Sequence, residues 1–457
     1  MQSLFFVPAD GRCSVPGERW GASSGEERWV GVGAIIAELF VLFAVAKLAG
    51  EVFQRLRQPP VIGELLAGVL IGPYALGWIG VPGPQLVALF HDPATAQEAL
   101  ALVYHVLAEL GAIFLLFFVG LETRLSDLLR VGVRAAVVAV TGVVLPFMLG
   151  ATLMLALGHP GPEAAFVGTA LVATSVGITA RVLGDLGYLA TLEARIILGA
   201  AVVDDILGMV VLAIMAGIGE NGQVAPLPIV TTAALAVAFT VFTALVGTRV
   251  VQLVSVRLEL LRIRNAPFVV AVAVCLGLAA LADVIGLAAI IGAFLAGLAF
   301  AETREQYALE RQTLPVYELL VPMFFVITGA SVDWRLFLDG PVVGLALGVT
   351  ALAILGKVIG CGLGAWGLGP RGMAIVGVGM APRGEVGLIV ASVGQDLHAI
   401  PDAVFSVVVV MSVLTTVAVP PLLPLLYRGY ASPAPSSPLA TDDDGLAAAQ
   451  DGRLPEL

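Results

Sequence analysis

The chain has 457 residues, of which 59% are hydrophobic and only 12% are charged, whereas a soluble globular domain has about 25% charged residues. Its mean hydropathy is +1.00, and apolar runs long enough to cross a bilayer recur along most of its length. These values exclude a single water-soluble domain and predict an integral membrane protein with several spanning helices. The net charge of -11 and the three scattered cysteines favour neither a nucleic-acid partner nor a disulfide framework.

Three segments follow one another along the chain. Residues 1–30 are polar and rich in glycine and serine, and we interpret them as an extracytoplasmic tail. Residues 31–427 contain thirteen candidate spans, read as apolar runs bounded by charges, proline or glycine. Residues 428–457 are rich in proline, serine and alanine and carry three consecutive aspartates, a composition typical of disorder. The sequence therefore predicts one all-α polytopic membrane domain between two tails.

The distribution of lysine and arginine predicts the orientation of the chain. Sixteen arginines, Arg181 among them, fall in alternate loops and the C-terminal tail, whereas the opposite loops hold only Arg335. Because basic loops stay in the cytoplasm, the N-terminus is predicted outside and the C-terminus inside the cell membrane, the inner membrane of a bacterium. Three further cations, Lys47, Lys357 and Arg383, fall within or at the edge of spans. A cation that cannot leave the bilayer needs a partner or a function.

Asp204 and Asp205 lie in the middle of an apolar run, with about eight apolar residues on either side. A charged side chain at the bilayer centre costs at least about 2.5 kcal/mol, so such groups mark ion or proton pathways unless they are paired for structure. Neighbouring residues on a helix point about 100° apart. One carboxylate can therefore pair with a cation while the other faces a cavity.

Lys357 lies too deep in its span for its ammonium group to reach the interface easily. An ion pair with an aspartate is the economical way to bury it. A buried lysine with such a partner can also release its proton when the partner is engaged elsewhere, so Lys357 is a candidate proton switch as well as a structural group.

Two spans carry signals of interrupted helices. Thr174 and Ser175 lie in a mid-span cluster of hydroxyl groups and glycines, and Pro382 with its flanking glycines interrupts a later span beside Arg383 and Glu385. Broken helices at corresponding positions of the two halves are typical of inverted-repeat transporters, in which freed carbonyls and half-helix ends hold an ion.

Signals for enzyme chemistry are absent from the sequence. The four histidines are scattered, no cluster has metal-enzyme spacing, and no GxSxG nucleophile motif occurs. A GxGxxG match at residues 360–367 lies inside an apolar span with no preceding strand, where helix packing through small residues explains it better than nucleotide binding does. We expect no cofactor, no nucleotide and no enzymatic activity.

Several motifs together resemble the monovalent cation:proton antiporter family over residues 31–427. The double aspartate with a later membrane lysine is similar to the sodium/proton antiporters of the NapA type rather than to the related Kef-type potassium systems. The resemblance implies inverted repeats, two crossing broken helices in a moving core domain, a separate dimerisation domain and a homodimer. The motifs that carry it are Arg57-Gln-Pro-Pro-Val-Ile-Gly-Glu-Leu-Leu-Ala-Gly, Gly120-Leu-Glu-Thr, Val203-Asp-Asp, Gly356-Lys357 and Pro382-Arg-Gly-Glu-Val-Gly.

The resemblance also implies a role for each site residue. Asp205 matches the acid that carries the proton and binds the cation, which makes it the Na⁺ ligand, and Asp204 matches the acid that pairs with Lys357. Thr174 and Ser175 occupy the first broken helix as further oxygen ligands, which suit a hard cation. The second broken helix carries Arg383 and Glu385, where ion pairing that holds the core together is expected.

The expected function is exchange of Na⁺ or Li⁺ for H⁺ by alternating access, with net movement of charge if Lys357 also loses its proton. Three alternatives stay open at this point. A potassium/proton exchanger would use the same residues, since selectivity depends on cavity geometry. A passive cation channel would not need an acid that must be neutralised before moving. An organic-anion transporter is disfavoured because the site is net acidic.

Overall fold

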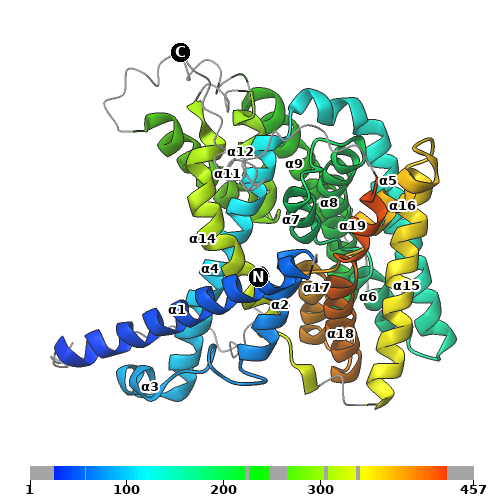
Figure 1. The fold of residues 1–457 in the computed structure, drawn as a ribbon. Helices are drawn as coiled ribbons and strands as arrows, with labels where there is room; N and C mark the ends of the chain where they lie inside the picture. Colours follow the sequence, from blue (N-terminus) through cyan, green and yellow to red (C-terminus); the bar gives the residue numbers. More distant parts are fainter. Residues whose placement is uncertain are drawn as a thin grey trace, which may run out of the picture.

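The computed structural model describes residues 25–429 apart from residues 57, 222–225, 248, 250, 252–264, 303–306 and 336–339, and every regular element in this part is helical. The first half contains α1 (Gly25–Arg55), α2 (Pro60–Ile71), α3 (Pro84–Phe90), α4 (Pro93–Glu122), α5 (Leu125–Ala156), α6 (Gly161–Ala170), α7 (Val176–Asp185) and α8 (Leu192–Asn221). The second half contains α9 (Pro226–Phe242), the π-helix η1 (Thr243–Gly247), α11 (Ala266–Val284), α12 (Ala289–Phe300), α14 (Leu309–Ala330), α15 (Gly340–Gly364), α16 (Gly369–Gly379), α17 (Glu385–Asp396), α18 (Asp402–Ala418) and α19 (Leu422–Tyr427) (Figure 1).

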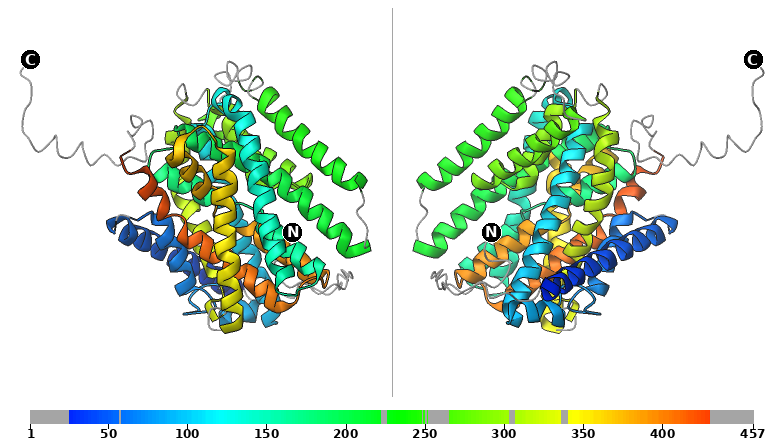
Figure 2. Two further views of the ribbon diagram at one scale, coloured as in Figure 1. Left: turned by 90° about the vertical axis from the view of Figure 1, so that its right-hand side faces the viewer. Right: turned by 90° about the vertical axis from the view of Figure 1, so that its left-hand side faces the viewer.

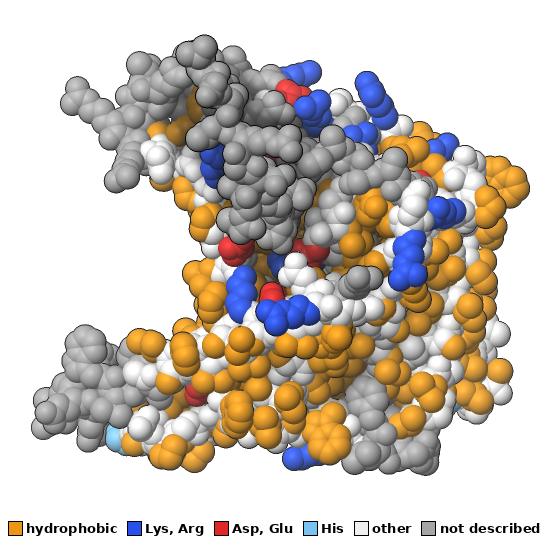
Figure 3. All heavy atoms as spheres, in the orientation of Figure 1, with side chains coloured by type: hydrophobic (Ala, Val, Ile, Leu, Met, Phe, Trp, Pro, Cys, Tyr) orange, Lys and Arg blue, Asp and Glu red, His pale blue; other side chains and the backbone are white. Residues whose placement is uncertain are grey.

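The predicted all-helical membrane fold is confirmed. In the described part of the chain, six helical stretches are long and apolar enough to cross a bilayer, and several shorter apolar helices accompany them. Hydrophobic side chains cover much of the molecular surface in Figure 3, as expected where lipid is the solvent. The number of thirteen spans stays a prediction.

Helix ends differ from the predicted span ends because helices continue past the last apolar residue. The sequence predicted a span from residue 98, but α4 begins at Pro93, where the Asp92 carboxylate accepts a hydrogen bond from the Thr95 amide at 2.9 Å and caps the helix. Likewise, α1 begins at Gly25, inside the segment predicted as a tail. Residues 1–24 and 430–457 lie outside the described residues, so the two tails stay predictions.

The helices form two groups that pack mainly within themselves. We name α1, α2, α4, α11, α12 and α14 the scaffold group, and α5, α6 and α8 with α15 to α18 the core group. We also place α7 in the core group, because it follows α6 across a helix break and its Thr179 donates to the carbonyl of Gly379 in α16. The two groups lie side by side in Figure 1, and Figure 2 shows the same bundle from two further sides. The principal contacts between the groups involve α7, which touches α2 and α4, while α9 and η1 touch α8 and α12 respectively.

Both predicted helix breaks are present in the core group. The first break separates α6 from α7 between Ala170 and Val176, and the second separates α16 from α17 between Gly379 and Glu385. The two breaks meet, since the backbone amide of Ser175 donates to the carbonyl oxygen of Pro382 at 2.9 Å. This crossing brings four half-helix ends together inside the core group.

Glycines lock the helices within the scaffold group by direct backbone contact. A methyl group added at Gly120 of α4 would lie 2.3 Å from the carbonyl oxygen of Phe294 in α12, and one at Gly68 of α2 would lie 2.0 Å from that of Val326 in α14. Because the obstructing atoms are backbone, the helices could accept such a group only by moving apart.

The same locking occurs within the core group but not at a glycine between the groups. A methyl group at Gly360 of α15 would lie 2.6 Å from the carbonyl oxygen of Thr141 in α5. At Gly177 of α7, which faces the scaffold group, the nearest atom is a methyl carbon of the Leu115 side chain at 3.4 Å, an ordinary contact distance. At these positions the helices within each group are in backbone contact, whereas the contact between the groups at Gly177 is a softer side-chain contact.

This difference predicts opposite effects for two matched glycine substitutions. Gly120→Ala should lower the unfolding temperature of the purified protein by several degrees or prevent folding, because overpacking against backbone costs about 1–3 kcal/mol or more. Gly177→Ala should be neutral or slightly stabilising, because alanine is preferred over glycine in a helix by about 1 kcal/mol. Thermal unfolding in detergent measures both, and equal stability of the two variants would contradict the rigid-group description.

Candidate functional site

The two adjacent acids of α8 point into different surroundings. Asp204 is 1% exposed and faces α15 within the core group, whereas Asp205 is half-buried and lies at the edge of that group. The angle of about 100° between neighbouring helical residues produces this separation. The two carboxylates can therefore have different roles.

Lys357 lies against the first of these acids. Its Nζ donates to Oδ1 of Asp204 at 2.7 Å, and both side chains are fully buried. Gly142 of α5 lies beside the pair and leaves room for Cys361, because a methyl group at Gly142 would lie 2.4 Å from the sulfur of Cys361 but at an ordinary contact distance of 3.5 Å from Nζ of Lys357. The second oxygen of Asp204, Oδ2, has no hydrogen-bond partner among the described residues. A buried cation and a buried anion are thus paired, with one acceptor atom left over.

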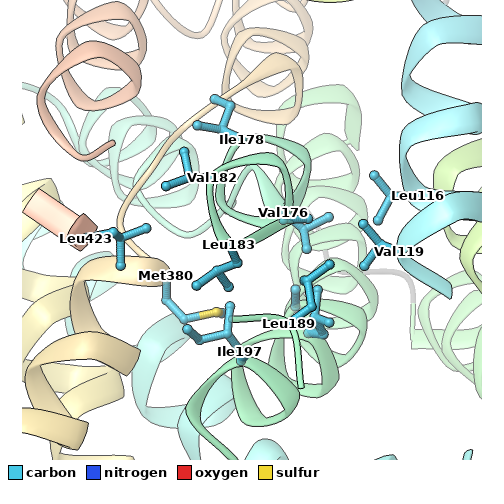
Figure 4. Packing of buried hydrophobic residues seen from close by; sticks show 14 of the residues in the cluster. Leu116, Val119, Val176, Ile178, Val182, Leu183, Leu189, Ile197, Met380 and Leu423 are labelled. Carbon is cyan, nitrogen blue, oxygen red and sulfur yellow. The ribbon is translucent and has the colours of Figure 1, made fainter. Parts of the chain in front are cut away.

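Asp205 lines a small cavity between the two groups. The cavity has a volume of about 10 Å³, close to the smallest volume that holds one water molecule. Figure 4 shows Val176 of α7 pointing toward Leu116 and Val119 of α4 across this apolar interface. The rest of the lining is apolar, so a water-sized occupant would have the Asp205 carboxylate as its charged neighbour. The lining residues are Leu116 of α4, Val176 of α7, Leu198, Ala201, Val202 and Asp205 of α8, and Ile290, Ile291 and Phe294 of α12.

Arg383 is fully buried at the crossing of the broken helices, where its guanidinium group donates to backbone carbonyls. Thr415 and Thr416 of α18 fix its backbone, the first by accepting from the Arg383 amide and the second by donating to the Arg383 carbonyl. The atom Nε has no hydrogen-bond partner among the described residues. The carbonyl acceptors are those of Leu171 at 2.6 Å, Ala381 at 3.1 Å, Ala353 at 3.3 Å and Met380 at 3.5 Å.

Arg383 offsets the charge of the two helix C-termini at the crossing. Leu171 caps the C-terminus of α6 and Met380 caps that of α16. Each helix C-terminus carries the equivalent of roughly half a negative charge, whereas the N-termini of α7 and α17, which begin at the same crossing, carry the opposite sign. Asp204 is neutralised by Lys357, whereas Asp205 lies at the cavity between the two groups.

The predicted oxygen ligands of the first break belong to the crossing. Thr174 donates its hydroxyl to the carbonyl of Met380 at 3.2 Å, and Thr179 donates to that of Gly379 at 2.6 Å. Ser175 contributes its backbone amide to the same crossing. Neither Thr174 nor Ser175 is among the residues that line the Asp205 cavity. The Glu385 side chain, predicted as a partner of Arg383, lies outside the described residues.

The sequence reading assigned Arg181 to a loop, and this assignment was wrong. Arg181 is 8% exposed within α7, because the helix continues to Asp185, whose Oδ2 accepts from Nε of Arg181 at 3.0 Å. The guanidinium also lies near Glu64 of α2 and over the ring of Tyr317 of α14. The spacing of four residues between Arg181 and Asp185 was the available signal, since it places both on one helix face.

Comparison with known proteins is consistent with this geometry. The transmembrane sodium/hydrogen exchanger family matches residues 40–425. The chain is 38% identical to the high-affinity Na⁺/H⁺ antiporter NhaS3 of Synechocystis sp., over 90% of this chain and 94% of that protein. It is 35% identical to the Na⁺/H⁺-K⁺ antiporter GerN of Bacillus cereus, over 84% and 94%.

A solved structure shares the fold. The sodium proton antiporter MjNhaP1 of Methanocaldococcus jannaschii at pH 8 aligns with a TM-score of 0.59 and 16% identity, over 90% of this chain and all of that one. The family match spans most of the chain, and the helical architecture agrees with it. The chain therefore belongs to the sodium/hydrogen exchanger family of monovalent cation:proton antiporters and is a multi-pass membrane transporter, not an enzyme.

Proposed function

We propose that this protein exchanges Na⁺ or Li⁺ for H⁺ across the cell membrane, with Asp205 as the residue that carries both ions. One observation carries the proposal: Asp204 is occupied by Lys357 at 2.7 Å, whereas its neighbour Asp205 faces the cavity between the two helix groups. The family membership and the name of NhaS3 as a Na⁺/H⁺ antiporter support the choice of ions.

The chemistry is competition for one carboxylate. Hard monovalent cations prefer oxygen ligands, and a carboxylate can hold either such a cation or a proton. When Asp205 is ionised and empty, its charge is exposed to an apolar interface lined by residues such as Leu116 and Phe294. Moving that charge through low-dielectric surroundings is unfavourable. The Asp205 site therefore moves from one membrane face to the other only with a proton or a cation bound. This requirement couples the flow of protons to the flow of cations.

The movement we propose is an elevator-like displacement of the core group against the scaffold group. Backbone contacts at glycines hold each group together, whereas Val176 and Leu116 meet across the interface through apolar side chains. Apolar surfaces without specific hydrogen bonds can slide at low cost. Such a displacement would expose the Asp205 cavity to one face of the membrane and then to the other.

Orientation and assembly are part of the same proposal. The excess of arginine in alternate loops supports an external N-terminus and a cytoplasmic C-terminus. The family resemblance supports a homodimer, in which the scaffold groups of the two copies contact each other while each core group moves.

A second candidate function is exchange of K⁺ for H⁺. The relative GerN is named a Na⁺/H⁺-K⁺ antiporter, and the same carboxylate could serve the larger ion if the cavity widens during the cycle. A passive cation channel is a third possibility, which the same experiment distinguishes.

Asp205→Asn should reduce exchange to the background of protein-free liposomes, because an amide can neither release a proton nor balance a cation. The measurement uses full-length protein in liposomes with a trapped pH dye and an imposed pH gradient, to which sodium, lithium or potassium salt is added. Asp402→Asn is the matched control, since Asp402 is exposed at the start of α18 and bonds to Gln395 at 2.7 Å. The control should exchange at the wild-type rate.

Each outcome of this experiment has a separate meaning. Normal exchange by folded Asp205→Asn would contradict the mechanism. Collapse of the gradient by potassium alone would favour the second candidate function. Cation entry without proton movement in the wild type, with uptake of radioactive sodium followed in parallel in the same liposomes, would favour the channel.

Lys357→Gln should remove most of the voltage dependence of transport. We propose that the bound cation also interacts with the Asp204 carboxylate and weakens its ion pair with Lys357. Lys357 then loses its proton, so more than one proton is exchanged per cation. Each net charge then couples to the membrane potential at about 2.3 kcal/mol per 100 mV. Exchange rates at zero and at -100 mV, set with a potassium ionophore in sodium-driven assays, measure this dependence. Unchanged voltage dependence in the variant would show that the lysine is structural.

A further inference from the structure

Arg181 connects the moving and stationary parts of the molecule. It lies on α7 of the core group, five residues after the cavity-lining Val176, which is about 7.5 Å along the helix axis. Its guanidinium contacts the scaffold group at two points, Glu64 of α2 and Tyr317 of α14. A charged contact therefore bridges the interface that we propose to slide.

The contacts on the two sides of Arg181 differ in closeness. Within its own helix, Nε donates to Oδ2 of Asp185 at 3.0 Å, a hydrogen-bonded ion pair. Across the interface, Nη2 lies 3.9 Å from Oε1 of Glu64, beyond hydrogen-bond distance, and the guanidinium carbon lies 5.1 Å from the centre of the Tyr317 ring. Asp185 can thus keep the arginine neutralised while the contacts to the scaffold group separate.

Unsatisfied atoms mark the same junction. Oε2 of Glu64 and Nη1 of Arg181 are buried and have no hydrogen-bond partner among the described residues. The side chain of Glu64 is only 3% exposed and that of Arg181 is 10% exposed. By contrast, the buried pair of Asp204 and Lys357 lies wholly within the core group at 2.7 Å. An ion pair that must open in each cycle is expected to be the looser of the two.

Glu64 lies on the scaffold side of this junction and is held close to α1. A methyl group at Gly50 of α1 would lie 3.5 Å from Oε1 of Glu64. Glu64 therefore belongs to the part of the molecule that stays in place when Arg181 withdraws with the core group.

We propose that Arg181 and Glu64 form a detachable latch between α7 and α2, which stabilises the conformation described here and must open each time the core group moves. The proposal rests on the proposed function, because it assumes that the core group moves against the scaffold group. Arg181 and Glu64 are positioning residues and bind neither transported ion.

Opening the latch by mutation should change the balance of conformations and leave exchange intact. Removing an ion pair that exists in one of two states lowers the population of that state, and the apparent affinity for a ligand follows the population of the state that binds it. Arg181→Gln or Glu64→Gln should therefore change the ratio of the half-saturating cation concentrations at the two membrane faces by about tenfold, equivalent to about 1.4 kcal/mol. The two concentrations should move in opposite directions.

The measurement uses oriented proteoliposomes with the cation supplied at one face or the other. The double variant Arg181→Gln/Glu64→Gln should match Arg181→Gln, because that change already removes the contacts of the guanidinium group to both Glu64 and Tyr317. Arg371→Gln is the matched control, since Arg371 is exposed on α16 and donates to the carbonyls of Leu426 and Arg428 within the C-terminal helices. An unchanged ratio in folded, active latch variants would overturn the proposal.

Cross-linking tests whether the contact opens during transport. In a background in which Cys13, Cys275 and Cys361 are replaced by alanine, a short bis-methanethiosulfonate, which forms a disulfide with each thiol and releases sulfinate, should join Glu64→Cys to Arg181→Cys and stop exchange. Reduction of the two disulfides should restore exchange. The pair Arg181→Cys/Asp185→Cys lies within α7, so joining it should leave exchange running. Undiminished exchange by the joined α2–α7 pair would show that the contact persists through the cycle and would contradict the latch.

The two proposals fail in different ways. If the cysteine-free background and the wild type show no cation-dependent proton movement, the proposed function fails. If both exchange normally while the latch variants and the joined pair behave like the wild type, the latch alone fails.

Discussion

The ion pair between Lys357 and Asp204 is the constraint on which the rest of the site depends. Two adjacent carboxylates in an apolar helix would repel each other and resist burial, but a lysine at 2.7 Å neutralises one of them inside the core group. Asp205 lies at the cavity instead, and in the proposed mechanism its charge is the one that a transported ion balances. One side chain from α15 thus distinguishes the two neighbouring acids of α8.

The same principle of local neutralisation governs the broken helices. Two half-helix C-termini converge where α6 and α16 end, and Arg383 supplies the positive charge that their carbonyls require. The carbonyls of these two ends are thus satisfied by Arg383, inside a core group whose helices are in backbone contact at glycines such as Gly360, which lies against Thr141. Backbone contacts inside each group and side-chain contacts between the groups would give the proposed motion a defined surface, and Arg181 is a charged contact across it.

The sequence predicted the two helix breaks and the residue types of the site, but it did not predict the contacts between distant helices. Ser175 and Pro382 marked the interrupted helices because hydroxyls, glycine and proline are local signals. The partner of Lys357 was predictable because a buried cation demands an acid and few acids lie at that depth. The carbonyls around Arg383 could not be predicted, since backbone acceptors are the same at every residue. The approach of Arg181 to the scaffold group depends on tertiary packing, which local sequence patterns do not encode.

The central claim is that proton and cation compete for one carboxylate, and the most direct test is the half-saturating cation concentration of wild-type exchange as a function of pH. Competition predicts that this concentration rises by about tenfold for each unit that the pH falls below the pKa of the site, more steeply if a second proton is displaced, while the maximal rate stays nearly constant. Half-saturating concentrations that do not change with pH would show that the two ions bind at independent sites and would contradict the account.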